Sequence, residues 1–152
     1  MDGNRQNAMV SAAEDVIDYS FIDKELPWEA IQAAGSNMAF RYPEGNKRLA
    51  MIGDAVVKLL VLEDLRVTDS PRGDMQNSVS YIGSNANLDR VGRLNNLDAI
   101  VNRNPSQPGA VAANTLTATF EALIGAVYLD SGGTTTLARL VMERLGLWPN
   151  RV

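Results

Sequence analysis

The sequence contains no cysteine and no histidine. The first absence excludes a disulfide framework and thiolate chemistry, and the second removes the commonest general base and transition-metal ligand. No apolar run approaches the ~20 residues that span a bilayer, and the opening MDGNRQNAMV lacks the apolar stretch of a signal peptide. We therefore expect an intracellular, soluble protein without a membrane partner, in a compartment that the sequence does not define. Any acid–base or metal chemistry would rest on carboxylates.

Basic residues are also in short supply. Fourteen Lys and Arg face eighteen Asp and Glu, which gives a net charge of −4. Affinity for nucleic acid comes largely from basic side chains that displace counterions from phosphates, so RNA binding by this chain alone should be weak. The length of 152 residues and the 45% apolar content fit one globular domain.

Helical spacing dominates the sequence and strand-like alternation is scarce, which predicts an all-α fold. Ser11 followed by Glu14 is typical of a capping box at the start of the first helix. We divide the chain into a flexible N-terminus (1–10), one helical domain (11–147) and a C-terminal tail (148–152). The expected helices cover about residues 11–21, 23–35, 46–66, 74–82, 85–94, 114–130 and 134–145, and residues 102–109 form the clearest loop.

Two of these helices, 46–66 and 114–130, should be buried. Apolar residues cover more than half of the circumference of segment 46–66, as in a helix surrounded by neighbours. Gly53 in its middle costs up to ~1 kcal/mol relative to alanine, which indicates that another backbone packs closely there.

The same two segments carry a family resemblance. Asn46 to Ala55 reads NKRLAMIGDA and Thr117 to Asp130 reads TATFEALIGAVYLD. They resemble the signatures of the ribonuclease III catalytic domain, NERLEFLGDA and ADTFEALIGAVYLD in their usual forms. Similar order and spacing extend over roughly residues 13–147. The resemblance implies a ribonuclease III-like helical domain that forms an intertwined homodimer, with double-stranded RNA as substrate and Mg²⁺ or Mn²⁺ as cofactor.

The chain departs from the family at the residues that carry the chemistry. The resemblance implies four carboxylates around the metal ion, at positions i and i+4 of one helix and i and i+3 of the other. Here those positions hold Ala50 and Asp54, then Ala118 and Glu121. Lys47 replaces a further family glutamate on the same helix face. Two acids beside an ammonium would hold Mg²⁺ or Mn²⁺ only weakly, because hard dications need several oxygen ligands.

The candidate site residues follow from this comparison. Asp54, Glu121 and Lys47 are the candidate catalytic residues, and Ala50, Thr117 and Ala118 are candidates for lining the cleft. The alternative is that Asp54 and Glu121 are buried relics, satisfied by Lys47 or by a hydroxyl such as that of Thr117.

Met51 stands where the resemblance implies a phenylalanine that inserts into the partner subunit. Methionine is flexible enough to fill that role, so we expect a dimer contact; a core methionine is the alternative.

Three functions remain open. The first is a pseudonuclease or weak nuclease related to double-stranded RNA processing. The second is an enzyme that reuses the fold for acid–base chemistry by Asp54 and Glu121 on a small organic, polyketide-like substrate. The third, a structural interaction subunit, ranks last because no basic extension is visible.

Overall fold

The computed structural model describes residues 3–149, which form seven α-helices and one short 3-10 helix and contain no β-strand. The all-α class predicted from the sequence is confirmed. In chain order the elements are α1 (Gly3–Ile17), α2 (Glu25–Ala30), α3 (Lys47–Val67), α4 (Arg72–Ile82), α5 (Asn85–Leu94), η1 (Leu97–Ile100), α6 (Ala113–Asp130) and α7 (Thr136–Leu145).

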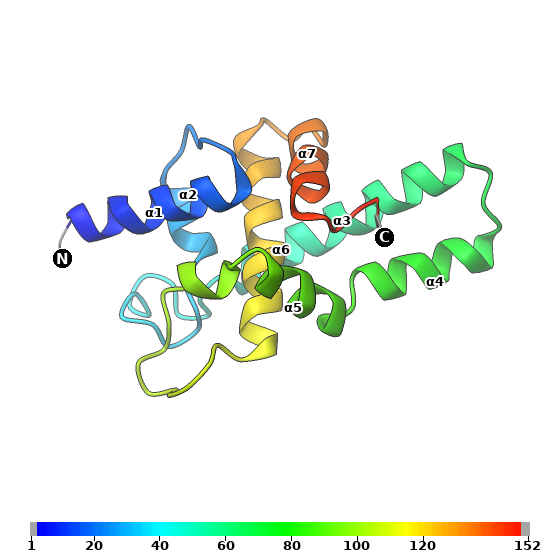
Figure 1. The fold of residues 1–152 in the computed structure, drawn as a ribbon. Helices are drawn as coiled ribbons and strands as arrows, with labels where there is room; N and C mark the ends of the chain where they lie inside the picture. The colour runs from blue at the N-terminus through cyan, green and yellow to red at the C-terminus, as the bar shows by residue number, and fades with distance from the viewer. Residues whose placement is uncertain (1–2, 150–152) are drawn as a thin grey trace.

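Helix α6 forms the centre of the molecule. Figure 1 shows it running through the middle of the fold, with α3 crossing it and α7 beside its C-terminal half. Ten of its residues are buried, and they occupy all sides of the helix. A helix that is apolar all round needs neighbours all round, and α2, α3, α5 and α7 supply them. No helix within residues 3–149 is both long and apolar enough to cross a membrane.

Two glycines set how closely α3 and α6 approach. A Cβ atom added to Gly53 would lie 1.7 Å from the carbonyl oxygen of Glu121, and one added to Gly125 would lie 2.5 Å from the carbonyl oxygen of Leu49. Each distance is far below a van der Waals contact, so only glycine fits at either position. The close backbone approach predicted at Gly53 is confirmed, and its partner is α6.

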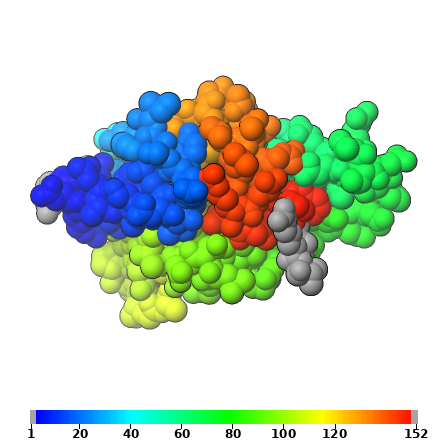
Figure 2. Space-filling view, turned by 45° about the horizontal axis from the view of Figure 1, so that its top comes forward, coloured from blue at the N-terminus to red at the C-terminus, as the bar shows by residue number. Residues whose placement is uncertain are grey.

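The second half of α3 and the whole of α4 form an arm that projects from one end of the molecule (Figures 1 and 2). The arm is thinly packed: Ile82 is the only buried residue of α4, and Val67 is 83% exposed. Asp64, in the last turn of α3, connects the arm to the body. Nη1 of Arg139 donates to both carboxylate oxygens of Asp64 at 2.6 Å, and the indole N–H of Trp148 donates to one of them at 2.6 Å.

The first helix begins earlier than we expected. Helix α1 starts at Gly3 rather than at Ser11, so residues 3–10 of the predicted N-terminal segment are helical. Val10 and Ile17 are buried on its inner face. Packing of an apolar face, rather than a local capping signal, therefore stabilises this helix.

The predicted capping box is also wrong. One carboxylate oxygen of Glu14 accepts a hydrogen bond from the Phe21 N–H at 2.6 Å and pairs with Nζ of Lys24 at 2.7 Å. Glu14 thus holds the connection between α1 and α2. The second helix is shorter than expected, because α2 ends at Ala30 and Gly35 lies in the following turn.

Helices α3 to α7 agree with the sequence within about two residues at each end. The Ser84 hydroxyl caps α5 by accepting a hydrogen bond from the Asn87 N–H at 3.2 Å. Ser84 is one of the two residues that we expected to cap this helix. Of the predicted C-terminal tail, Trp148 packs against the core, and residues 150–152 lie outside the described part of the chain. The division into terminus, domain and tail stays a prediction.

Candidate acid pair at the crossing of two helices

The acid pair consists of Asp54 on α3 and Glu121 on α6. Gly53 abuts the main chain of Glu121, so the close crossing of the helices brings the two carboxyl groups together. Burial raises the pKa of Glu121 to about 8; Asp54 raises it further by accepting a hydrogen bond from the carboxyl proton and by repelling a second negative charge. At neutral pH most molecules therefore keep a proton on Glu121.

Lys58 is the third member of the site, and our sequence analysis missed it. Its Nζ lies 3.0 Å from one carboxylate oxygen of Asp54, one helical turn along α3. The ammonium also opposes the rise in the pKa of Glu121. The signal was present in the sequence, because an acid and a lysine four residues apart on a helix lie side by side.

Lys47 is not the ionic partner of Asp54, and its assignment as a catalytic residue stays a prediction. The ion pair of Asp54 is formed by Lys58, and Lys47 forms no ion pair with any residue from 3 to 149. Its side chain lines a cavity of about 200 Å³, together with Ala118. The two candidate catalytic acids are therefore adjacent, whereas the third candidate, Lys47, lines a cavity that neither acid lines.

The three candidate cleft residues are dispersed. Ala118 lines the cavity beside Lys47, whereas Ala50 is buried in the hydrophobic core with 8% exposure. The Thr117 hydroxyl donates to the main-chain carbonyl of Asn85 at 3.2 Å and so is directed toward α5. The expectation that Thr117 could satisfy the acids is wrong.

The residues present do not fit the metal ion that the family signatures imply. Within residues 3–149, no three acidic side chains gather where they could hold a metal. Of the two acids that remain, Asp54 is paired with an ammonium and Glu121 retains a proton. Glu63 is an acid that could have replaced a missing ligand. One of its carboxylate oxygens lies 3.5 Å from a guanidinium nitrogen of Arg139, so Glu63 is paired there.

Met51 lies on the outer face of α3 with 76% of its surface exposed, so it is not a core residue of the single chain. It borders an open apolar hollow of about 390 Å³, which we call the α3 apolar face. The other residues of this face are Ile52, Ala55, Val56, Leu59 and Tyr128.

The chain is similar in sequence to known ribonucleases. A family model described as Ribonuclease-III-like matches residues 24–146. Ribonuclease 3 of Aliarcobacter butzleri (strain RM4018) is 31% identical over 140 residues, covering 89% of this chain and 60% of that protein. Ribonuclease 3 of Oleidesulfovibrio alaskensis is 31% identical over 147 residues, covering 93% of this chain and 64% of that protein. The chain thus spans less than two thirds of the length of these relatives.

The fold is similar to that of the nuclease domain of ribonuclease III from Campylobacter jejuni. One solved structure of that domain gives a TM-score of 0.77 at 22% identity and covers 90% of this chain and 96% of that chain. A second structure of the domain gives a TM-score of 0.76 at 20% identity and covers 100% of this chain and 99% of that chain. These likenesses confirm the helical fold that the sequence signatures implied.

Proposed function

The chain belongs to the ribonuclease-III-like family, and from that premise we propose that it is a divergent member, a pseudonuclease or at most a weak nuclease. One observation carries this proposal: Asp54 forms an ion pair with the Lys58 ammonium, at a place where no three acidic side chains gather within residues 3–149. The raised pKa of Glu121, about 8, adds to it, because a carboxyl that keeps its proton at neutral pH is a poor ligand for a cation.

The charge at the site argues against a tightly held dication. Mg²⁺ and Mn²⁺ prefer several oxygen ligands, and alanine stands at positions 50 and 118, where the family signatures have acids. An incoming ion would have to displace the proton of Glu121 and move the ammonium of Lys58. We therefore expect Mg²⁺ or Mn²⁺ to be held weakly.

Double-stranded RNA remains the expected class of nucleic-acid partner, with low affinity. The net charge of −4 opposes binding to a polyanion. A duplex bound without cleavage would fit a role in RNA processing that depends on shape recognition rather than on catalysis.

We further propose that the chain forms a homodimer through the α3 apolar face. A methionine that is 76% exposed beside a 390 Å³ apolar hollow is typical of a surface that is covered in the assembly. The structure from Campylobacter jejuni is described as flexible in a region involved in dimer formation. Light scattering after gel filtration should give twice the mass of the 16.5 kDa chain, and Met51→Asp should give the monomer mass.

Incubation with long duplex RNA tests the main proposal. With Mg²⁺ or Mn²⁺ present, we expect no cleavage above the background of an Asp54→Asn variant. Ribonuclease 3 of Aliarcobacter butzleri serves as the positive control under the same conditions. Efficient metal-dependent cleavage that Asp54→Asn abolishes would show that the two acids still support catalysis.

A second candidate function is acid–base chemistry on a small organic, polyketide-like substrate. It is favoured by the contact between a carboxyl that keeps its proton, Glu121, and a carboxylate, Asp54, since such a pair can donate one proton and accept another. The Lys58 ammonium pairs with this carboxylate at 3.0 Å.

Ligand-detected NMR with a set of aromatic β-dicarbonyl compounds tests the second candidate. We expect compounds whose binding is lost in Glu121→Ala but kept in Glu143→Ala, which removes an exposed glutamate of α7. If no compound distinguishes the two variants, the acid pair does not form a small-molecule site.

A further inference from the structure

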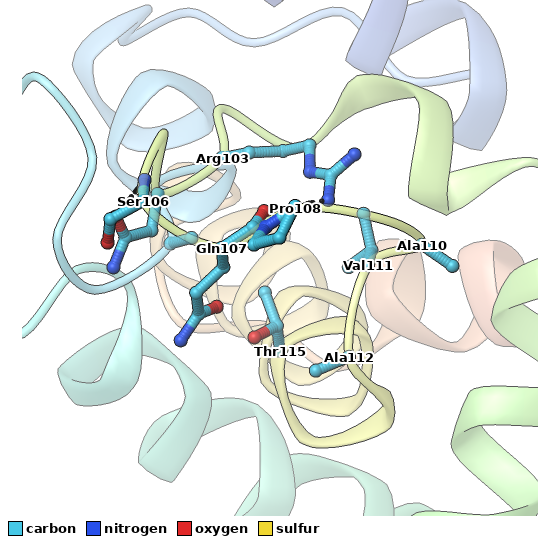
Figure 3. Close-up of a pocket in the computed structure, with 10 residues that line it drawn as sticks. Arg103, Ser106, Gln107, Pro108, Ala110, Val111, Ala112 and Thr115 are labelled. Atoms are coloured by element: carbon cyan, nitrogen blue, oxygen red, sulfur yellow. Dashed lines mark hydrogen bonds between the residues drawn. The ribbon is translucent and has the colours of Figure 1, made fainter.

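Two adjoining cavities lie between the loop 102–112 and the first turns of α6. The larger, about 310 Å³, is lined mainly by the loop from Arg103 to Ala112 (Figure 3). The smaller, about 200 Å³, reaches Lys47 at the start of α3. Three residues line both cavities: Ala33, Gln107 and Thr115. The cavities therefore adjoin at these residues, and we call the two together the loop groove.

The base of the loop groove is held in place by hydrogen bonds. The Ala33 N–H donates to the carbonyl of Asn102 at 3.0 Å, and the Asn102 N–H donates to the carbonyl of Ile31 at 2.8 Å. The buried side chain of Asn102 donates to Oε1 of Gln32 at 2.7 Å. Such a base does not need to be ordered when a ligand binds, which lowers the free-energy cost of binding.

The loop itself is closed by Arg103. Its guanidinium donates to the main-chain carbonyls of Gln107, at 3.3 Å, and of Gly109. Figure 3 shows this side chain lying along the loop, next to Pro108. One guanidinium nitrogen of Arg103 is thus used by the loop, whereas Lys47, the other cation of the groove, has no ion pair within residues 3–149.

The electrostatic character of the loop groove is positive, in a chain of net charge −4. No Asp or Glu is among its lining residues. Lys47 has no ion pair within residues 3–149, and no described protein group hydrogen-bonds the side chains of Gln107 or Asn114. One ammonium and two amides without a protein partner therefore line the same solvent-accessible cavity, and the amino end of α6 adds a smaller positive contribution.

We propose that the loop groove binds a small organic anion. Its phosphate or carboxylate would lie against Lys47, Asn114 and Gln107, and the rest of the molecule would extend into the larger cavity beside the loop. A hollow of this size, with Lys47 as its unpaired cation beside two amides, suits one anionic group, whereas duplex RNA needs a row of cations along its backbone. This site goes beyond the proposed function and does not depend on whether the domain cleaves RNA.

NMR titration of the ¹⁵N-labelled chain with inorganic phosphate, and separately with adenosine monophosphate, tests the proposal. We expect saturable shifts of the amide signals of Gln107, Asn114 and Thr115. Lys47→Gln should weaken binding of both probes at least about tenfold, since it removes the one charge–charge contact of the site. Arg66→Gln is the matched control: it removes an equal charge from an exposed position on the same helix, and affinity should stay within about twofold.

A second variant keeps the test independent of Lys47. Ala118→Asp places a carboxylate in the groove wall and should also weaken both probes, while thermal unfolding shows that the variant is folded. Equal affinity in Lys47→Gln and Arg66→Gln, or no saturable shift with either probe, would overturn the proposal. A 16-base-pair RNA duplex is titrated in parallel, and groove shifts that occur with the duplex alone would overturn the assignment to a small anion.

Discussion

Two neighbouring sites on α3 and α6 differ in charge and in the pairing of their charged groups. In the first, Asp54, Glu121 and Lys58 form a cluster in which each charge has a partner or is removed by a proton. In the second, Lys47 lines a polar groove and has no ion pair within residues 3–149. The same pair of helices therefore carries a neutralised acidic cluster and an unpaired lysine, seven residues apart on α3.

The comparison shows which part of a family site the fold preserves. The glycines that allow the crossing and the two acids next to it are present. Three of the acids that the family resemblance implies are replaced, by alanine at 50 and 118 and by lysine at 47. Our proposal is therefore that fold and site chemistry separate in this chain: the backbone geometry agrees with the family, and the charges at the crossing have changed.

The largest effect is expected from breaking the crossing. Gly53→Ala directs a methyl group into the main chain of Glu121, 1.7 Å away, so the helices must separate. We expect a loss of about 3 kcal/mol or more in the free energy of unfolding, measured with urea. Gly73→Ala in α4 is the control: its Cβ meets nothing within 4 Å, and the change should be neutral or stabilising by up to ~1 kcal/mol. A Gly53→Ala variant as stable as the natural chain would contradict the geometry of the crossing.

The next effect is the recovery of a cation site. Lys47→Glu, Ala50→Glu and Ala118→Asp, combined with Lys58→Met, restore the acids and remove both ammonium groups. Calorimetry should show Mn²⁺ affinity at least about 100-fold above that of the natural chain, because affinity follows the number and charge of oxygen ligands. Adding acids at the exposed positions Ala12 and Ala86 should leave affinity unchanged. If both sets of changes act equally, the gain reflects net charge and not the site.

A smaller effect concerns pH. The pKa of Glu121 lies near 8 in the folded chain against an ordinary 4.5, so the folded state binds the proton more tightly than the unfolded state. Stability should therefore fall as pH rises from about 4.5 through 8, and Glu121→Gln should remove this loss. Between pH 5 and pH 9, the free energy of unfolding of Glu121→Gln should rise by roughly 1–2 kcal/mol relative to that of the natural chain. This value is lowered from the full pKa shift because solvent screens a partly exposed group. Glu143→Gln should leave the pH profile unchanged, and a natural profile that is flat over this range would contradict the raised pKa.

The smallest effect is that of Lys58. Its ion pair with Asp54 is half exposed, so Lys58→Met should change the free energy of unfolding by no more than about 0.5 kcal/mol. The ammonium lowers the pKa of Glu121, and its removal should move the titration midpoint of that carboxyl further upward. Carboxyl ¹³C NMR would follow the midpoint, and a downward movement would contradict the assigned role.

Much of the fold could be predicted from local pattern. The buried helices 46–66 and 114–130, the close approach at Gly53 and the Ser84 cap each depend on a few neighbouring residues, and the structure has all of them. The start of α1 could not be predicted in this way, because burial against the body, rather than a capping residue, extends it to Gly3.

The site was only partly predictable. The family resemblance implied that Asp54 and Glu121 lie together, and helical spacing pointed to Lys58, which we overlooked. Spacing also put Lys47 on the face of Asp54, but the side chain lines a cavity formed by a distant loop. The loop groove arises from residues near 33, 47, 107 and 115, which only the tertiary fold brings together.

Electron paramagnetic resonance of Mn²⁺ mixed with the natural chain at pH 7 tests the central claim most directly. Because Lys58 and a proton neutralise the two acids at the crossing, we predict a free-ion spectrum throughout the micromolar range. Stoichiometric loss of the free-ion signal in the natural chain, reversed by Asp54→Asn, would contradict the account.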